Sequence, residues 1–420
     1  MTMSRRKTVA LIDPVWVGHH PMYFSEFAAS LLRCGARVIG LCPEPAAAIK
    51  DIARAVDAET AGQLTELVHV ANLPAGKRSF FNGRFEGDPV RTFSRWRWAA
   101  KALADAESAA GLRADLVYFP YLDSYLRFLP FPQVPDAILK RPWSGLYLRN
   151  HHHGEAASLM KSIRLLAKGD AIFRSNSCLG VGVLDERFIP EMEILTGKPV
   201  TAYPDVTRGG LPATPLPLTV ELQRKAAGRS IIGIIGLERR KGFLTLIRTA
   251  ELARIQNLPY YFVCAGAIPL GEYSDAERAA IARLTEDIAS GKIQNLHFES
   301  KASWIRDQAD FNSLFSCFDI AWSAYEGFHG SSGTLSKAAL FETPCLATAG
   351  ECIGQRVEKY RLGLTIPEAS PEHALAAISL LAAGKDRDGN PLSPCFAQYR
   401  ADHSQARLDR NLGALVASLD

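Results

Sequence analysis

Residues 326–334 bring together one carboxylate, three hydroxyl side chains and several glycines, a set suited to binding phosphate. The run reads Glu326-Gly327-Phe328-His329-Gly330-Ser331-Ser332-Gly333-Thr334. Its hydroxyl groups are hydrogen-bond donors, and its glycines let a ligand approach the backbone. If a helix begins here, its first N–H groups and its positive dipole end favour a bound anion. A capped helix without a ligand is the alternative, and this stretch alone leaves both interpretations open.

The flanking residues predict the elements that would position this turn. An apolar, strand-like run begins at Ala321 and ends at Tyr325, and a helix-forming run covers 335–341. Pro344 then precedes a second apolar strand, 345–348. The order is therefore strand, Gly/Ser-rich turn, helix and strand, which is typical of an α/β sheet with its ligand at the carboxyl end of a strand.

This stretch resembles the donor-site signature of retaining glycosyltransferases of family four, which have the GT-B fold. The resemblance rests on Ser-x-x-Glu-Gly-Phe at 323–328, on the Gly/Ser turn and on x-Pro-x-hydrophobic-Ala-Thr-x-Gly at 343–350. It continues through 354–358, 363–367 and 370–378. With the stretch from Ile231 it covers most of the C-terminal half, whereas the N-terminal half matches loosely.

The resemblance implies a role for a second loop, which follows an apolar strand at 230–236. Gly236 is followed by Leu237-Glu238-Arg239-Arg240-Lys241-Gly242 and by a helix pattern at 243–255. In the family, a Gly…Arg…Lys-Gly loop at this place holds the nucleotide diphosphate. Lys241 matches the lysine, and Arg239 or Arg240 would replace the arginine. Two cations beside a departing diphosphate stabilise the charge that develops there. The alternative is a basic turn on the surface.

The chain departs from the family at its Glu-x7-Glu pair. Glu326 matches the first glutamate, which contacts the donor sugar in the family. Eight residues later stands Thr334, and alignment backward from Pro344 puts Lys337 at the second position. A lysine cannot accept hydrogen bonds from ribose hydroxyls. The phosphates would then depend more on the backbone of 331–334, and an inactive family member is an alternative.

The N-terminal half begins with a βαβ pattern: a strand at 8–12, a helix at 22–33 and a strand at 38–42. The loop after the first strand lacks the GxGxxG dinucleotide fingerprint. Family-four enzymes have a glycine-rich loop here, whereas this chain offers Gly18 followed by His19 and His20. We expect these three residues to meet the sugar or the acceptor. A capping or exposed histidine pair is the alternative.

A further candidate, Asp123, follows a strand pattern at 115–121. Its carboxylate would either orient the acceptor or cap the next helix, and the cap is the preferred interpretation.

Residues 77–101 carry seven basic side chains interleaved with aromatic ones. A helix is expected from Val90, with Phe93, Trp96, Ala100 and Leu103 on its buried face. The segment is then either a core helix with solvated arginines or a patch that contacts an anionic membrane or a lipid phosphate.

Composition excludes several classes of protein. A net charge of +4 over 420 residues is too small to indicate nucleic-acid binding. The eight cysteines show no CxxC or Cys/His ligand spacing, which argues against zinc and agrees with a reducing compartment. The longest uncharged run, 255–271, is interrupted by Pro259, Gly266 and Pro269 and predicts no membrane span. We expect a cytoplasmic protein, with peripheral contact to the inner face of the membrane as an option.

The resemblance implies two doubly wound Rossmann-like α/β domains that face each other across a cleft. The expected boundaries are 1–205 for the acceptor-side domain, 206–218 for a linker, 219–395 for the nucleotide-sugar domain and 396–420 for a C-terminal helix that returns to the first domain. The predicted activity is retaining transfer of a sugar from a nucleotide-diphosphate donor to a saccharide or lipid-linked hydroxyl acceptor. It needs no metal or other cofactor. A sugar-nucleotide epimerase and a non-catalytic sugar-nucleotide-binding protein are the alternatives.

Overall fold

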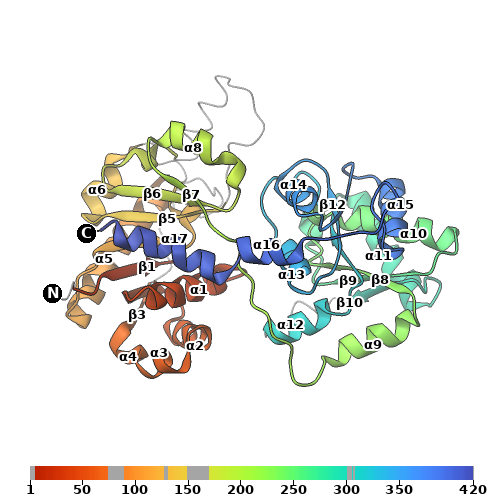
Figure 1. The fold of residues 1–420 in the computed structure, drawn as a ribbon, viewed down its shortest axis with the longest axis horizontal. Helices are drawn as coiled ribbons and strands as arrows, with labels where there is room; N and C mark the ends of the chain where they lie inside the picture. Colours follow the sequence, from red (N-terminus) through yellow and green to blue (C-terminus); the bar gives the residue numbers. More distant parts are fainter. Residues whose placement is uncertain are drawn as a thin grey trace. The chain divides into compact units, whose positions relative to one another are not determined.

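A computed structural model describes residues 5–73, 89–126, 131–148, 170–299, 305 and 308–419. The chain divides into two compact units (Figure 1). Unit 1 contains residues 1–204 and 405–420, and unit 2 contains residues 205–404. Part of the predicted membrane segment, 77–88, lies outside the described residues.

Unit 1 is built on a parallel sheet of seven strands in the order β3-β2-β1-β4-β5-β6-β7. The strands are β1 (Thr8–Ile12), β2 (Arg37–Cys42), β3 (Val68–Asn72), β4 (Leu116–Phe119), β5 (Trp143–Tyr147), β6 (Cys178–Val183) and β7 (Val200–Ala202). β1 has the bounds that its apolar run predicted, and all five of its residues are buried. Burial on both faces is typical of parallel strands that helices cover on each side.

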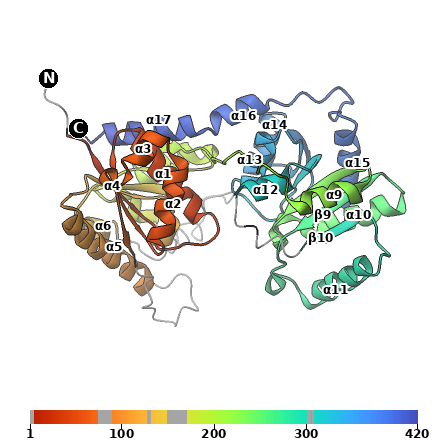
Figure 2. The same ribbon diagram turned by 90° about the horizontal axis from the view of Figure 1, so that it is seen from below.

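Helices cover both faces of this sheet (Figure 2). They are α1 (His20–Arg33), α2 (Pro45–Ala55), α3 (Ala58–Gly62), α4 (Leu64–Leu67), α5 (Pro89–Ala110), α6 (Gln133–Leu139), α8 (Ile189–Thr196) and α17 (Gln405–Ala417), with short 3-10 turns η1 (Leu122–Tyr125), η2 (Asp170–Arg174) and η3 (Glu186–Phe188). The last helix, α17, packs on α1, where Arg33 forms an ion pair of 2.9 Å with Asp409.

The buried face of α5 differs from the prediction at one end. Trp96 and Leu103 pack in the core as expected, and the Trp96 indole N–H donates to the carbonyl oxygen of Tyr125 at 2.9 Å. Phe93, however, was expected in the core and is 41% exposed. The helix begins at Pro89, so Phe93 lies in its second turn. The helical period alone could not show where the core ends along the helix.

Unit 2 has a second parallel sheet, of six strands in the order β10-β9-β8-β11-β12-β13. The strands are β8 (Ser230–Ile235), β9 (Tyr260–Ala265), β10 (Leu296–Glu299), β11 (Ile320–Ser323), β12 (Cys345–Thr348) and β13 (Gly363–Ile366). The helices are α9 (Pro217–Ala226), α10 (Phe243–Ile255), α11 (Asp275–Ala289), α12 (Gln308–Phe315), α13 (Gly333–Leu340), α14 (Cys352–Lys359), α15 (Pro371–Ala382) and α16 (Phe396–Asp402), with 3-10 turns η4 (Arg239–Lys241) and η5 (Leu270–Glu272).

The predicted fold class, two doubly wound Rossmann-like α/β units, is confirmed. In each sheet the strand order reverses once, between β1 and β4 in unit 1 and between β8 and β11 in unit 2. Such switch points leave a crevice at the carboxyl ends of the strands, where α/β proteins bind ligands. They are therefore the first places to look for function.

The first residues of unit 2 form no helix or strand but are hydrogen-bonded to α12 and α13. Ser336 on α13 donates to the carbonyl oxygen of Asp205 at 2.9 Å. Asn312 on α12 donates to the carbonyl oxygens of Arg208 (3.2 Å) and Gly210 (2.8 Å). The predicted linker therefore carries a hydrogen-bonded segment at its start.

Lys337 belongs to this network. Its ammonium donates to the carbonyl oxygen of Arg208 at 2.7 Å and to Oδ1 of Asn312 at 2.5 Å, and the residue is 6% exposed. Burial lowers the pKa of Lys337 from 10.5 to about 8. The sequence predicts Lys337 at the donor site, and in the structure its ammonium is hydrogen-bonded to the backbone of residue 208.

This buried amine makes stability depend on pH in a defined direction. Between about pH 8 and 10.5 the folded protein releases the Lys337 proton while the unfolded chain keeps it. Because the unfolded state then binds more protons, the free energy of unfolding rises with pH in this window. Relative to Lys337→Met, the wild type should gain about 2 kcal/mol between pH 7 and pH 10, measured by urea denaturation.

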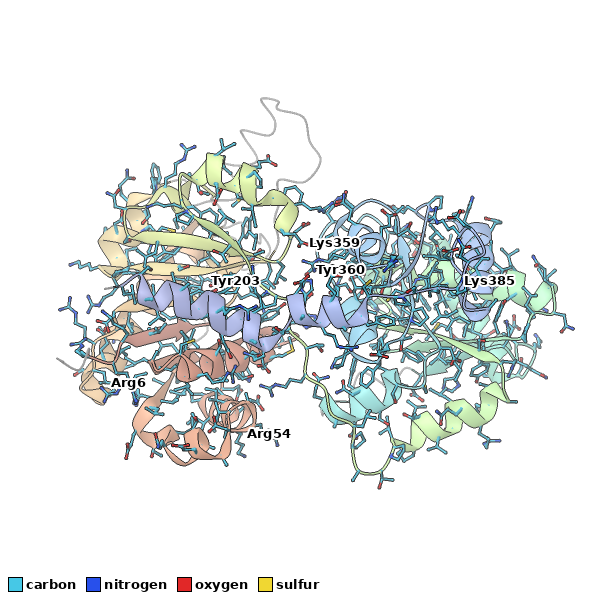
Figure 3. All side chains as sticks on the ribbon, viewed as in Figure 1. Arg6, Arg54, Tyr203, Lys359, Tyr360 and Lys385 are labelled. Atoms are coloured by element: carbon cyan, nitrogen blue, oxygen red, sulfur yellow. The ribbon has the colours of Figure 1, made fainter. Side chains whose placement is uncertain are left out.

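Lys385→Met is the control, because Lys385 (labelled in Figure 3) is exposed. Its stability difference from the wild type should not follow the same trend. A pH-independent difference between the wild type and Lys337→Met would contradict the assigned environment of Lys337.

Candidate functional site

The loops after β8 and β11 are joined by their backbones at the switch point of unit 2. The N–H of Glu326 donates to the carbonyl oxygen of Arg240 at 2.8 Å, and the Trp322 indole N–H donates to the carbonyl oxygen of Lys241 at 3.1 Å. Gly242, at φ +72°, sits against Ala324 so closely that a Cβ would overlap its carbonyl oxygen. The two predicted donor loops are thus held in contact.

The carboxylate of Glu326 is fixed from α10. Thr245, which is buried in the first turn of that helix, donates its hydroxyl to Oε1 of Glu326 at 2.6 Å. Glu326 itself is half-buried. The hydrogen bond orients a carboxylate whose remaining lone pairs can accept from hydroxyl groups of a bound molecule.

Lys241 is held beside the end of β8. Its Nζ donates to the carbonyl oxygen of Ile235 at 2.8 Å and lies 3.2 Å from Oε2 of Glu238. Gly236, at φ +82°, leaves room for this ammonium, because a Cβ there would overlap Nζ. Burial acts to raise the pKa of Glu238, but the nearby charges of Lys241 and Arg240 outweigh this effect and lower the pKa.

The two arginines of this loop point to different neighbours. The guanidinium of Arg240 lies 4.9 Å from the ring centre of Phe328, in the predicted turn. Arg239 instead donates to Glu277 on α11 at 3.1 Å. The hydrogen bond from the backbone N–H of Ser274 and that from Arg239 together lower the pKa of Glu277 to about 2. The sequence left open which arginine serves the site, and this placement favours Arg240.

The hydroxyls of the 326–334 turn bond within unit 2. Ser332 is buried and caps α13 by accepting from the N–H of Thr334 at 3.2 Å. The hydroxyl of Tyr325 lies 2.9 Å from that of Ser332 and 3.2 Å from that of Thr334, and Ser331 donates to Asp205 at 3.0 Å. Ser332 is therefore the helix cap, and the capped helix start that the sequence offered as an alternative is present.

Two of the remaining residues of the turn, Phe328 and His329, line an adjacent cavity. His329 pairs with Glu351 at 2.9 Å, Gly327 has φ +58°, and Gly330 lies against the Phe328 ring. Next to Phe328 and His329 is a cavity of 220 Å³ at the carboxyl ends of β11 and β12. It is lined by Ser323, Tyr325, Phe328, His329, Thr348, Ala349, Gly350, Glu351, Ile353, Gly354 and Glu368. A larger hollow of 710 Å³ between α10 and α11 has none of the predicted site residues among the described residues that line it.

In unit 1, His20 begins α1 at the carboxyl end of β1. Its Nδ1 lies 2.8 Å from Oδ2 and 2.9 Å from Oδ1 of Asp13, whose side chain is fully buried. The imidazole stacks on the ring of Tyr121 with centroids 3.9 Å apart. His19 is exposed and makes no side-chain cap of α1, and Gly18 turns at φ +61°. The two predicted histidines thus differ in environment.

Asp123 is not a helix N-cap. It lies inside η1, and its Oδ2 accepts from the N–H of Leu148, just after β5, at 2.9 Å. The preferred interpretation of the sequence was therefore wrong. The N–H group that the carboxylate accepts from lies just after the neighbouring strand rather than in the turn that follows.

Sequence reasoning missed the residues that hold the candidate side chains. Asp13 had a usable signal, since a carboxylate directly after a fully buried strand needs a partner. Thr245 and Asp205 had none, because their contacts with Glu326 and Ser331 span 81 and 126 residues.

Two further properties concern only the described part of the chain. There, no three histidine, cysteine or acidic side chains gather closely enough to hold a metal ion. Nor does any described helix combine the length and apolar character that crossing a membrane requires.

Comparison with known proteins gives the fold class an independent basis. No family model and no curated protein sequence matches the chain. Among solved structures, sucrose-phosphate synthase from Thermosynechococcus elongatus is similar over 99% of both chains, with 16% identity and a TM-score of 0.64. A glycosyltransferase from Rickettsia africae matches over 99% of both chains (14%, 0.61). HepE of Anabaena, in complex with UDP and glucose, matches over 99% of this chain and 100% of its own (15%, 0.59). The chain has the GT-B fold of these proteins.

The contact between the two loops predicts that replacing Gly242 by a larger residue destabilises the protein. Gly242→Ala would put a Cβ into the carbonyl oxygen of Ala324 and strain a left-handed residue. Left-handed strain and overpacking each cost about 1–3 kcal/mol. We expect the melting temperature to fall by about 5–10 °C, as scanning calorimetry would measure. Gly271→Ala is the matched control, since its Cβ would meet open space; equal melting temperatures for both variants would contradict the contact.

Proposed function

We propose that the protein transfers a sugar, with retention, from a nucleotide-diphosphate donor to a hydroxyl acceptor without a bound metal. The observation that carries this proposal is the backbone junction between the β8 and β11 loops. It gathers two cations and one oriented carboxylate at the switch point of unit 2. A nucleotide-diphosphate sugar has the complementary chemistry, with anionic phosphates next to a hydroxyl-rich ring.

In this proposal each side chain has a distinct role. Lys241 and Arg240 stabilise the negative charge that builds on the diphosphate as the glycosidic bond breaks. Glu326, oriented by Thr245, accepts hydrogen bonds from the sugar hydroxyls. Phe328 and His329 border the 220 Å³ cavity beside it. The leaving phosphate takes the acceptor proton in the mechanism that the family resemblance implies.

The donor base is the least constrained part of the proposal. At the position where the family has a glutamate that holds the ribose hydroxyls, this chain has Lys337, whose ammonium is buried against residue 208. The HepE structure contains UDP and glucose, which makes UDP-glucose the first donor to test. The acceptor class that we propose is a saccharide or a lipid-linked saccharide.

Turnover should depend on the Lys241 charge. Lys241→Met removes a cation from the departing diphosphate, so the transfer rate should fall about 100-fold or more. The measurement is nucleotide release from UDP-, GDP-, ADP- and dTDP-sugars, alongside the rise in melting temperature that each causes. Lys292→Met is the control, because Lys292 is exposed and pairs with Asp287.

Other outcomes would select another function. A nucleotide sugar that stabilises the protein and returns as its epimer without an acceptor would identify an epimerase. Stabilisation without any turnover would identify a binding protein. Unchanged turnover in Lys241→Met would refute the role of this lysine.

We also propose that the protein touches the inner face of the membrane through α5 and the preceding residues from 77. Val90 and Phe93 are exposed near the start of this helix. Exposed apolar side chains next to arginines favour anionic lipid surfaces. The protein should float with anionic but not with neutral liposomes, and Phe93→Ser should weaken flotation. Absence from both kinds of liposome would remove the idea.

A further inference from the structure

The cavity of 710 Å³ in unit 2 lies between α10 and α11. α11 packs on β10, the edge strand of this sheet (Figure 2). The helix is described over its whole length of 15 residues, and Ile281 is its one buried residue. Pockets that hold small molecules measure about 300–1,000 Å³, so this cavity is large enough for a ligand.

The walls of this cavity are largely apolar. Nine of the 17 described residues that line it are alanine, leucine or isoleucine. Four of them pack against the core but stay half-buried, namely Leu244 and Ile247 on α10, Leu284 on α11 and Ile293 before β10. Covering such surface with apolar groups instead of water is favourable. The walls therefore suit a hydrocarbon chain.

Two of the three carboxylates that line the cavity have cationic partners. Glu277 pairs with Arg239 at 3.1 Å, and Asp287 pairs with Lys292 at 2.8 Å. The third carboxylate is that of Glu251, an exposed residue of α10. Because two of the three charges are neutralised locally, the carboxylates offer little repulsion to an anion.

Three arginines line the same cavity, and none of them forms an ion pair with a carboxylate among the described residues. Arg248 and Arg254 belong to α10 and Arg283 to α11, so both helices contribute cations. All three are exposed. A guanidinium matches the geometry of carboxylates and phosphates, and its carbon stem can cover apolar surface. These arginines therefore complement an anionic group attached to the chain that the walls favour.

We propose that this cavity binds an anionic amphiphile with a single hydrocarbon chain. The chain lies between α10 and α11, and the carboxylate or phosphate head group contacts Arg248 and Arg283. The cavity contains none of the residues assigned to the nucleotide sugar, so it is a second binding site of unit 2. The inference does not rest on the proposed function.

The first test compares amphiphiles of equal chain length and opposite charge. Dodecanoate, dodecyl phosphate and dodecyltrimethylammonium are titrated into the full chain in a calorimeter, below the concentrations at which they form micelles. The tighter anion should bind one-to-one, about 10-fold or more tightly than the cation, and should raise the melting temperature. Shortening its chain should weaken binding by about 4-fold for each methylene removed. Equal binding of anions and cation, or no binding of either anion, would overturn the proposal.

The second test locates the bound chain. Ala280→Phe places a ring in the cavity, whereas the neighbouring Ala279 does not line it, so Ala279→Phe is the matched control. The affinity for the tighter anion should fall about 10-fold or more in Ala280→Phe and stay unchanged in Ala279→Phe. Because both alanines are exposed, both variants should melt near the wild-type temperature. Equal affinities of the two variants would place the amphiphile elsewhere and refute the proposal.

Charge variants test the head-group contacts separately. Arg248→Gln and Arg283→Gln should each weaken binding of the tighter anion about 5-fold or more, because each removes a charged hydrogen-bond donor. Arg224→Gln is the control, since Arg224 is an exposed residue of α9 that does not line the cavity. Unchanged affinity in both cavity variants would overturn the proposal. None of these measurements uses a nucleotide sugar, so they stand or fall independently of the proposed function.

Discussion

The candidate site of unit 2 depends on one backbone hydrogen bond, from the N–H of Glu326 to the carbonyl oxygen of Arg240. In a doubly wound sheet, the loops on either side of the switch point belong to strands that are distant in sequence, here by about 85 residues. This bond and the Trp322 contact to Lys241 hold the loops in register. A single such bond is worth only about 1 kcal/mol, so its importance lies in geometry rather than in stability. It fixes where the carboxylate stands relative to the cations.

The polar residues around α13 show why the chemistry of a turn cannot be assigned from composition. Serines and threonines next to glycines suggested a phosphate cradle, yet Ser332 caps the helix and Ser331 bonds Asp205. Buried polar groups must find partners, and a short hydroxyl side chain finds them first within its own fold. Lys337 follows the same rule, because its ammonium satisfies the carbonyl of Arg208, which belongs to a segment without regular structure.

Much of the fold could be predicted because its signals are local. The apolar run 8–12 gave β1 with its observed bounds, and the pattern 243–255 gave α10. The general neighbourhoods of Glu326 and Lys241 were also predictable, from motif spacing. The orientation of side chains was not. Thr245 meets Glu326, and Asp123 meets Leu148, across sheet neighbours whose order no local pattern encodes. Phe93 shows the same limit at a helix end, where the period continues but the core does not.

The two units differ in the partner that holds the carboxylate at the switch point of each sheet. Each sheet presents a carboxylate at its switch point, and a half-buried or buried carboxylate must be hydrogen-bonded to remain ionised. In unit 2 the partner of Glu326 is the hydroxyl of Thr245, which orients the carboxylate and leaves it as the group that meets a ligand. In unit 1 the partner of Asp13 is an imidazole, so the carboxylate is shielded and the histidine becomes the outward-facing group. The first arrangement presents carboxylate oxygens that can accept hydrogen bonds from hydroxyls, whereas the second presents an imidazole ring. The partner of each carboxylate therefore decides which chemistry its unit can perform.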